Sequence, residues 1–340
     1  MLHGHGDDLY LYPDIRINFS SNVYNHFSHA ALFSYLSGRL EGVVNYPDPT
    51  PRQLEQELAG EMGLTPSQVM VTNGATEAIY LVAQTWRDSR SSILVPTFSE
   101  YADACRMQGH DVRFIRSLTQ LDDAPSHLCW LCNPNNPTGQ VFDKEILLNA
   151  IKSHADVLFV IDASYAVFTR QPLLTAAEAV LMPNVLLLHS MTKEFAIPGL
   201  RLGYLTGASA LLHRIGRQRM PWSVNRLAQD AGSYLIRHRS DYQLPLDTLL
   251  AERQRMATQL QQLGLTTWPS DTHILLCRLP NGMASTLKEH LARHYKYLIR
   301  DASNFQGLDA SCFRIAVQTP QENDALLHAI ALFLDDSKVR

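Results

Sequence analysis

The sequence has no excess of basic residues. Its 340 residues include 29 lysines and arginines against 33 aspartates and glutamates, which gives a formal net charge of −4. A domain that binds nucleic acid usually carries a basic patch. The chain also has no block of like charges and no low-complexity tract. We therefore expect no nucleic-acid partner and no long disordered tail.

Long hydrophobic runs are missing as well. The longest apolar runs, such as NVLLLH at residues 184–189, are far shorter than the ~20 residues of a membrane-spanning helix. The first residues, MLHGHGDDLYLYPD, lack the basic and then apolar regions of a signal peptide. Five scattered cysteines, an odd number, fit a reducing compartment better than a disulfide framework. We expect a cytoplasmic protein with no membrane contact.

Two common kinds of site have no signature in the chain. There is no GxxxxGK[ST] loop, so nucleotide hydrolysis would lack its phosphate-binding segment. The 14 histidines form no HExxH pattern or other ligand spacing. Cys129 and Cys132 have no second ligand pair, and on a strand they would point to opposite faces. We predict no metal site and a structural role for the cysteine pair.

What the sequence does contain is a regular alternation of helical and strand-like segments. From about residue 53, amphipathic helices alternate with strands that are apolar throughout, which indicates a mostly parallel sheet covered on both faces. After about residue 220 long helices precede short strands, as in an α+β domain. We predict an α/β fold with a large domain at 41–222, a smaller α+β domain at 223–340, and an N-terminal segment, 1–40, packed with the smaller domain.

Several predicted strands end in polar residues, and ligands of such sheets bind beyond the carboxyl ends of the strands. NGATEA at 73–78 begins a helix, where free N–H groups favour an anion, although simple capping by Asn73 or Thr76 would also explain it. NPNNPTG at 133–139 is dense in amides and turn formers. Asp162 ends a buried strand, where an acid needs a cation or strong donors.

SMTKEFAIPGLRLGY, residues 190–204, adds a lysine after two hydroxyl residues and an arginine eight positions later. Anion-binding amides at one strand end, an acid at another and a lysine at a third together describe a pyridoxal 5'-phosphate site. The lysine forms a Schiff base with this cofactor, and the acid protonates its pyridine nitrogen.

At these residues the chain resembles the class I/II aminotransferases of the aspartate aminotransferase fold type. NPNNPTG, DASY at 162–165 and SMTKEFAIPGLRLGY are similar to the family's signatures, in the same order, and the resemblance extends from residue 45 to 313. It implies the pyridoxal-phosphate-dependent transferase fold type I, with a mostly parallel seven-stranded sheet. Within the family the chain resembles histidinol-phosphate aminotransferases, and more closely threonine-phosphate decarboxylases of cobalamin biosynthesis, through HGHGDD, YLIRDASNFQGL and FRIAVQTPQENDALL.

The resemblance implies a cofactor site. Lys193 would bind the cofactor and move protons at the substrate's Cα, while Asp162 would keep the pyridine nitrogen protonated. The other implied contacts are Ala75, Thr76, Ser190 and Arg201 at the phosphate, Asn136 and Tyr165 at the phenolic oxygen, Tyr101 on the ring face, and Tyr46 from a neighbouring subunit. The contact from Tyr46 implies a homodimer.

The resemblance also implies a site for a phosphorylated small-molecule substrate. Arg314 would bind a carboxylate, and Arg300 would bind the second anionic group. The other implied substrate contacts are His5, Gly6, Asn22 and Asn136. The chain departs from the decarboxylases at NFSSNVYNHFSHA, residues 18–30, which predicts a differently shaped substrate loop.

Three functions are left open by the sequence. The first is decarboxylation of threonine phosphate, and the second is transamination of histidinol phosphate with 2-oxoglutarate. They differ in which bond at Cα lies perpendicular to the cofactor ring, a geometry that small displacements decide. The third is a non-catalytic aminotransferase-like module. It would need a DNA-binding domain before residue 45 and would tolerate loss of Lys193 or Arg314.

Overall fold

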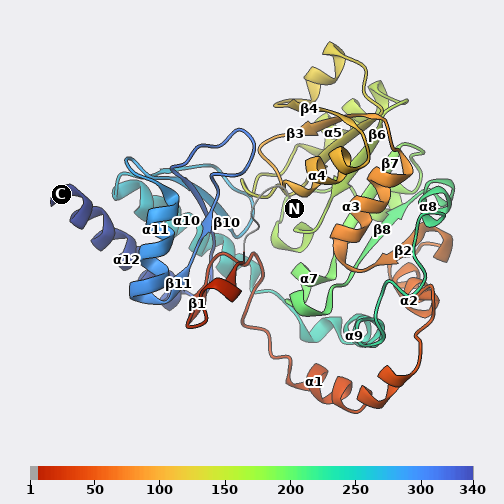
Figure 1. Ribbon diagram of the computed structural model, residues 1–340, viewed down its shortest axis with the longest axis horizontal. Coiled ribbons are helices and arrows are strands. Elements are labelled where there is room, and N and C mark those ends of the chain that lie inside the picture. The colour runs from red at the N-terminus through yellow and green to blue at the C-terminus, as the bar shows by residue number, and fades with distance from the viewer. Residues whose placement is uncertain (1–6, 340) are drawn as a thin grey trace.

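The computed structural model describes residues 7–339. The largest of its sheets has seven strands in the order β2-β8-β7-β6-β5-β3-β4 (Figure 1). Its strands are β2 (Val69–Thr72), β3 (Arg90–Leu94), β4 (Asp111–Ile115), β5 (Leu128–Cys132), β6 (Leu158–Asp162), β7 (Val185–Ser190) and β8 (Gly203–Gly207). Only β8 runs antiparallel to its neighbours, β2 and β7. The predicted mostly parallel seven-stranded sheet is confirmed.

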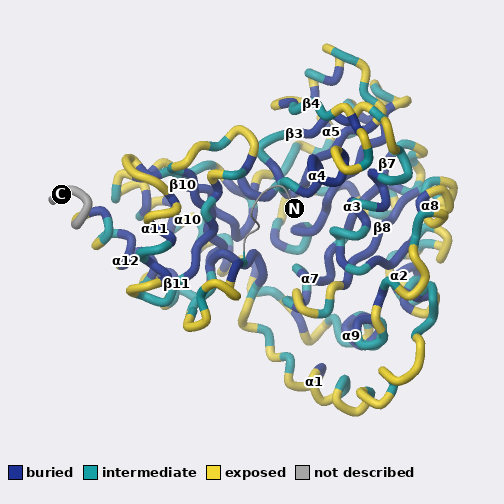
Figure 2. Tube along the Cα trace, viewed as in Figure 1, coloured by how far each residue is buried: buried dark blue, intermediate teal, exposed yellow. Residues whose placement is uncertain are grey.

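Helices cover both faces of this sheet. They are α2 (Arg52–Met62), α3 (Gly74–Thr85), α4 (Glu100–Met107), α5 (Lys144–Ser153), α6 (Ala176–Ala179) and α8 (Ser209–Gly216). Along β5, Trp130 packs in the core with α3 and α4, whereas Leu131 packs in the core with α5. Cys132 and Cys129 divide between these two cores in the same way, as the strand period predicts. Figure 2 shows the strands as buried, with exposed residues concentrated on the outer elements.

A second, four-stranded antiparallel sheet has the order β12-β13-β10-β9 and lies to the left in Figure 1. Its strands are β9 (Thr266–Thr267), β10 (Ile274–Arg278), β12 (Arg300–Asp301) and β13 (Cys312–Ala316), and its helices are α10 (Leu246–Gln262), α11 (Ala284–His290) and α12 (Pro320–Val339). Leu275, Phe313 and Ile315 form its core with these helices. Nearby, β1 (Ile17–Asn18) pairs with β11 (Tyr297–Leu298). The smaller α+β part of the predicted fold is therefore present.

The remaining helices pack beside the large sheet. Leu32 of α1 (Ala30–Ser37) and Ala228 of α9 (Arg226–Arg237) share a core with α2, below the large sheet in Figure 1. Phe195, just after α7 (Met191–Glu194), joins the same core. The short 3-10 helices are η1 (Leu9–Leu11), η2 (Leu40–Val44), η3 (Pro66–Gln68), η4 (Leu118–Asp123), η5 (Ala166–Phe168), η6 (Pro198–Leu200) and η7 (Arg239–Asp241), and η8 (Leu291–Tyr295) is a short π-helix. The domain bounds 1–40, 41–222 and 223–340 stay a prediction.

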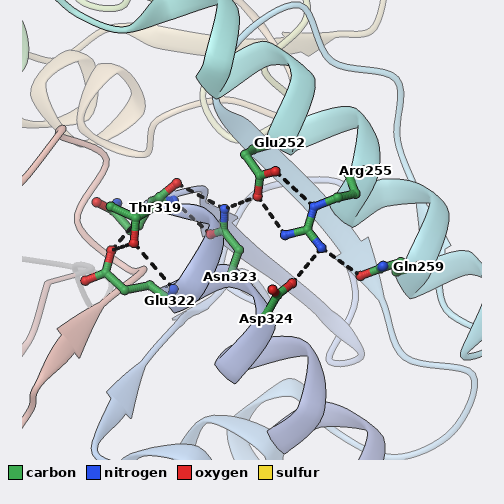
Figure 3. Close-up of polar contacts among 8 residues, drawn as sticks. Glu252, Arg255, Gln259, Thr319, Glu322, Asn323 and Asp324 are labelled. Atoms are coloured by element: carbon green, nitrogen blue, oxygen red, sulfur yellow. Dashed lines mark hydrogen bonds and ion pairs between the residues drawn. The ribbon is translucent and has the colours of Figure 1, made fainter.

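A buried polar network ties α10 to α12 (Figure 3). Asn323 is fully buried, and its amide donates to Glu252 Oε2 at 2.9 Å while its oxygen accepts from the Gln318 backbone N–H at 2.9 Å. Arg255 links Glu252, at 2.7 Å, with Asp324, at 2.6 Å. Gln318 lies two residues after the end of β13, so the network holds the segment that follows the strand carrying Arg314.

None of the helices within residues 7–339 has the length and apolar character that crossing a membrane requires.

Candidate active site

A cavity of about 590 Å³ opens at the carboxyl ends of the parallel strands. Residues that end β6 and β7 line one side of it, and residues of β12 and β13 line the other. The predicted residues that line it are Asn22, Ala75, Thr76, Tyr101, Asn136, Asp162, Tyr165, Ser190, Lys193, Arg201, Arg300 and Arg314. The fold thus gathers in one place residues that are far apart in the sequence.

Lys193 projects into this cavity from α7, which begins where β7 ends. Its amine donates a hydrogen bond to Asn22 Oδ1 at 2.5 Å. Burial, together with the charges of Arg314 and Arg201, lowers the pKa of the Lys193 amine to about 8, against the opposing effects of Asp7 and Asp162. A larger fraction of the amine is therefore neutral, and hence nucleophilic, near neutral pH.

Asp162 is a buried acceptor at the end of β6. Its Oδ2 accepts from the Tyr101 hydroxyl at 2.6 Å, and its Oδ1 accepts from the Ser164 backbone N–H at 2.9 Å. These donors hold the carboxylate in one orientation, and Tyr101 is itself held by stacking on Trp130 with ring centroids 5.9 Å apart. A fixed, buried carboxylate in a ligand cavity suits a cationic ring nitrogen.

The amino end of α3 faces the guanidinium of Arg201. A Cβ on Gly74, whose φ is 77°, would lie 2.7 Å from Nη2 of Arg201, and a Cβ on Gly203 would lie 2.6 Å from the Ala75 nitrogen. Glycine at both places therefore lets the backbone and the guanidinium approach each other. The N–H groups at the start of a helix and a nearby arginine form a cradle for a phosphate dianion.

Hydroxyl groups complete this cradle. Ser190 and Thr192 are buried and line the cavity on either side of Met191. Among the described residues, Thr192 Oγ1 has no hydrogen-bond partner. A buried hydroxyl without a partner in a ligand cavity is available to an incoming acceptor such as a phosphate oxygen.

Arg314, on β13, reaches across from the smaller sheet. Its Nη1 donates to Asn136 Oδ1 at 2.6 Å, and its Nη2 donates to the Ser20 carbonyl. Burial lowers the pKa of Arg314 to about 10; the Tyr165 hydroxyl opposes this shift and the charge of Arg300 adds to it. Arg314 is 3% exposed, so an anion that enters the cavity would meet a largely desolvated cation.

Arg300, on β12, lies directly opposite Arg314 in the antiparallel register. Its Nη2 donates to Asn304 Oδ1 at 2.8 Å, and its guanidinium lies 5.4 Å from the ring centroid of Phe305. Burial lowers the pKa of Arg300 as well. Two like charges across one strand pair repel each other, so this end of the cavity favours a ligand with two anionic groups.

Asn22 links the amine to the phenol of Tyr165. Besides accepting from Lys193, its amide donates to the Tyr165 hydroxyl. Burial raises the pKa of Tyr165, so the hydroxyl remains protonated and can donate to a ligand oxygen. Sequence reasoning placed Asn22 at the substrate, and the structure adds a contact with the amine itself.

One predicted residue, Tyr46, does not line this cavity. It is 84% exposed, and its ring packs against that of Trp222 with centroids 5.2 Å apart. The predicted residues His5 and Gly6 lie outside the described residues.

Other cavity residues escaped the sequence analysis. Thr192 had a usable signal, because it is a hydroxyl residue directly before the lysine. Asn304 and Phe305 follow Arg300 by four and five residues, but no local pattern shows that they hold its guanidinium. Asp7 also lines the cavity, and only the folded chain places it there.

The groups present fit pyridoxal 5'-phosphate. Thr192 offers a buried hydroxyl without a partner in the described chain, and glycines keep space between the α3 amino end and Arg201. Lys193 and Asp162 would supply the amine and the acid that this cofactor uses. Within residues 7–339, no cluster of three or more histidine, cysteine, aspartate or glutamate side chains could hold a metal ion.

Comparison with known proteins agrees with this geometry. The family model for aminotransferase class I and II matches residues 14–330. Threonine-phosphate decarboxylase of Salmonella typhimurium is 33% identical over 334 residues, which cover 94% of this chain and 91% of that protein. Histidinol-phosphate aminotransferase of Caldanaerobacter subterraneus is 27% identical over 304 residues, covering 84% of this chain and 83% of that protein.

The fold is also similar to that of a solved structure. The crystal structure of L-threonine-O-3-phosphate decarboxylase from Porphyromonas gingivalis superposes with a TM-score of 0.90 at 36% identity. The match covers 94% of this chain and all of the other.

Proposed function

The chain belongs to the class I and II aminotransferases, enzymes that depend on pyridoxal 5'-phosphate, and on that premise we propose that it decarboxylates L-threonine O-3-phosphate. The product would be aminopropanol phosphate. This substrate is an amino acid with two anionic groups, a carboxylate and a phosphate.

The observation that carries the proposal is the pair of guanidinium groups on β12 and β13. Arg314 and Arg300 lie opposite each other, are both buried, and line the same cavity as Lys193. In our proposal Arg314 binds the carboxylate and Arg300 binds the phosphate. Charge-assisted hydrogen bonds of this kind are about twice as strong as neutral ones, so a substrate lacking one anion would lose one of these two contacts.

The cofactor would be held by the residues already described. Lys193 attaches it, Asp162 pairs with its ring nitrogen, and the α3 amino end binds its phosphate together with Arg201 and Ser190. When bound, pyridoxal phosphate supplies an electron sink conjugated with the substrate's Cα. Asn136, Tyr165 and Tyr101 are the residues proposed to orient the ring.

In this proposal Lys193 also donates a proton to the substrate. Breaking the bond between Cα and the carboxylate releases carbon dioxide and leaves an electron pair that a proton must neutralise at Cα. The Lys193 ammonium donates that proton, because its pKa of about 8 leaves a mixture of both forms near neutral pH. Asn22 holds the amine on the cavity side while it is free of the cofactor.

The choice of decarboxylation over transamination rests on the relatives. The decarboxylases of Salmonella typhimurium and Porphyromonas gingivalis share more identity with this chain, and over more of its length, than the histidinol-phosphate aminotransferase of Caldanaerobacter subterraneus does. The second candidate function is transamination of histidinol phosphate, whose phosphate and glutamate's two carboxylates would also engage two arginines.

Two incubations of the cofactor-loaded enzyme separate these candidates. One contains L-threonine O-3-phosphate alone, and the other contains histidinol phosphate with 2-oxoglutarate. Carbon dioxide from the first and no glutamate from the second is the expected result. Glutamate from the second, without carbon dioxide from the first, would replace the decarboxylase with the aminotransferase.

We also propose a homodimer in which Tyr46 reaches the cofactor phosphate of the neighbouring subunit. Exposed apolar side chains around η2 support it, since such patches often mark interfaces. They are Phe33, Leu40, Val43, Val44, Tyr46, Met220 and Trp222. A cytoplasmic location is proposed in turn from the five cysteines, all of which are free and buried.

A further inference from the structure

Next to α7, the carboxylates of Glu194 and Glu61 both pair with the guanidinium of Arg239. Arg239 Nη1 pairs with Glu194 Oε1, and Arg239 also pairs with Glu61, through Nε at 2.6 Å and through Nη2 at 3.2 Å. The guanidinium carbon lies 5.4 Å from the ring centroid of Phe195. The three charged residues come from α7, from the end of α2 and from η7, so Arg239 joins three segments.

Glu194 is the residue directly after Lys193, and both belong to α7. This helix has only four residues, too few to be stable by itself. Its orientation must therefore come from contacts of its side chains and of the turn that follows. His29 contacts the Phe195 carbonyl through Nε2 at 2.8 Å, and Ala196 has a φ of 51°, a conformation that surrounding contacts must hold.

The Glu194 side chain is 15% exposed, so water solvates its carboxylate only weakly. Burial raises the pKa of Glu194 to about 7, the charge of Arg239 opposes that shift, and Glu61 adds to it. Tyr204, on β8, is the further titratable group beside this cluster. A buried carboxylate that loses its guanidinium must protonate or move, and either change acts on the helix that carries Lys193.

We propose that Glu194 and Arg239 are positioning residues for Lys193. Their ion pair holds α7 in the orientation that directs the neighbouring amine into the cavity. Glu61 secures Arg239 from the far side but is not attached to α7. The inference rests on the proposed role of Lys193 as the group that attaches the cofactor, and not on which substrate is used.

The test compares Glu194→Ala and Glu194→Gln with Glu61→Gln. Glu61→Gln alters the other carboxylate of the same arginine, on α2, where the side chain is 31% exposed. For each cofactor-loaded variant, two quantities are measured without substrate: the rate of cofactor release, and the pH midpoint of the visible absorbance band. With substrate, kcat and KM are measured separately, and thermal unfolding reports whether the fold is intact.

Glu194→Ala is expected to release the cofactor about tenfold faster or more and to lower kcat about tenfold with little change in KM, since misplacement by ~1 Å can cost ~10²-fold. Its band midpoint should move by about one pH unit, a tenfold change in the underlying equilibrium. Glu194→Gln should lie between it and wild type, and Glu61→Gln should remain within about threefold of wild type. If Glu194→Ala does not fold, Glu194→Gln carries the test.

Wild-type release rate, midpoint and kcat in a folded Glu194 variant would overturn the proposal, as would equal losses in Glu61→Gln. An enzyme that transaminates instead of decarboxylating would contradict the proposed reaction but leave the two substrate-free measurements, and hence this inference, standing.

Discussion

At the scale of single residues, burial and the charges around Lys193 together set the pKa of its amine. Arg314 and Arg201 add to the effect of burial, and the folded chain lowers the pKa of this lysine from 10.5 to about 8. Only the deprotonated amine attacks the aldehyde of the cofactor. The rate of cofactor incorporation into the cofactor-free protein should therefore rise with pH and level off above about pH 8.

Stopped-flow absorbance of the visible band measures that rate across pH 6–10. Arg314→Gln removes one of the causes of the low pKa, so its profile should move to higher pH. Lys193→Ala should give no band. A wild-type profile that still rises steeply above pH 9 would show that the amine is not perturbed as described.

Arg300 should determine recognition of the phosphate. Arg300→Gln removes the charge-assisted contact, which is worth roughly 1.5–3 kcal/mol, so KM for threonine phosphate should rise about tenfold to a hundredfold. Arg278→Gln is the matched control, because Arg278 lies on β10 of the same sheet but pairs with Asp309 at a 42%-exposed site. Steady-state kinetics of both variants measure the effect, and equal changes in KM would contradict the assignment.

Single residues also show where sequence reasoning works. Lys193 and Asp162 follow strand-like runs, so their place at the sheet edge could be predicted from local pattern. Glu194 and Arg239 are 45 residues apart, and Asn22 is 171 residues from Lys193. Contacts over such separations depend on how the elements pack, and nothing in the local sequence encodes that.

At the scale of elements, the amino end of α3 needs the space that glycine leaves. Gly74→Ala would place a Cβ 2.7 Å from Arg201 Nη2 at a φ of 77°, which costs backbone strain and displaces the guanidinium. Cofactor affinity should fall by about an order of magnitude, equivalent to ~1.4 kcal/mol.

Gly60→Ala provides the control for that variant. Gly60 lies in α2, and a Cβ there meets nothing within 4 Å, so alanine should stabilise the helix by about 0.5–1 kcal/mol. Cofactor titration and thermal unfolding of both variants measure these effects. Unchanged cofactor affinity in Gly74→Ala would contradict the proposed phosphate cradle.

The network between α10 and α12 should contribute strongly to stability (Figure 3). Asn323→Ala removes a donor to Glu252 and an acceptor for the Gln318 N–H, both buried. Unsatisfied buried groups cost ~1–3 kcal/mol each, so unfolding in urea should shift by about 2–4 kcal/mol. Asp324→Asn, at a 64%-exposed site, should change stability by less than about 1 kcal/mol. Similar losses in the two variants would rule out a special role for Asn323.

At the scale of the whole molecule, the proposed dimer makes each active site depend on both subunits. Mixing and refolding Lys193→Ala with Tyr46→Ala, each nearly inactive, should restore about a quarter of wild-type activity, because half of the random dimers are hybrids with one intact site. Activity assays after refolding, with sedimentation to confirm dimers, measure this. No restoration in hybrid dimers would mean that Tyr46 acts within its own chain.

The overall architecture was largely accessible from the sequence, because apolar strands alternating with helices leave few arrangements open. The antiparallel direction of β8 could not be predicted, since the residue pattern of a five-residue strand such as GYLTG does not indicate whether it pairs parallel or antiparallel to its neighbours. Nor was the packing of α9 beside α2, because its amphipathic pattern shows that one face is buried but not against which neighbour.

The central claim is that the enzyme breaks the bond between Cα and the carboxylate. In this account Arg314 and Arg300 bind the two anionic groups of the substrate, and Lys193 donates a proton to Cα. The most direct measurement uses L-threonine O-3-phosphate labelled with carbon-13 in the carboxylate, with 2-oxoglutarate present as an amino acceptor and the reaction run in D2O. The account predicts labelled carbon dioxide and an aminopropanol phosphate that keeps its original Cα hydrogen and gains one deuterium at that carbon. A labelled keto acid that has lost the Cα hydrogen would contradict it and identify the enzyme as an aminotransferase.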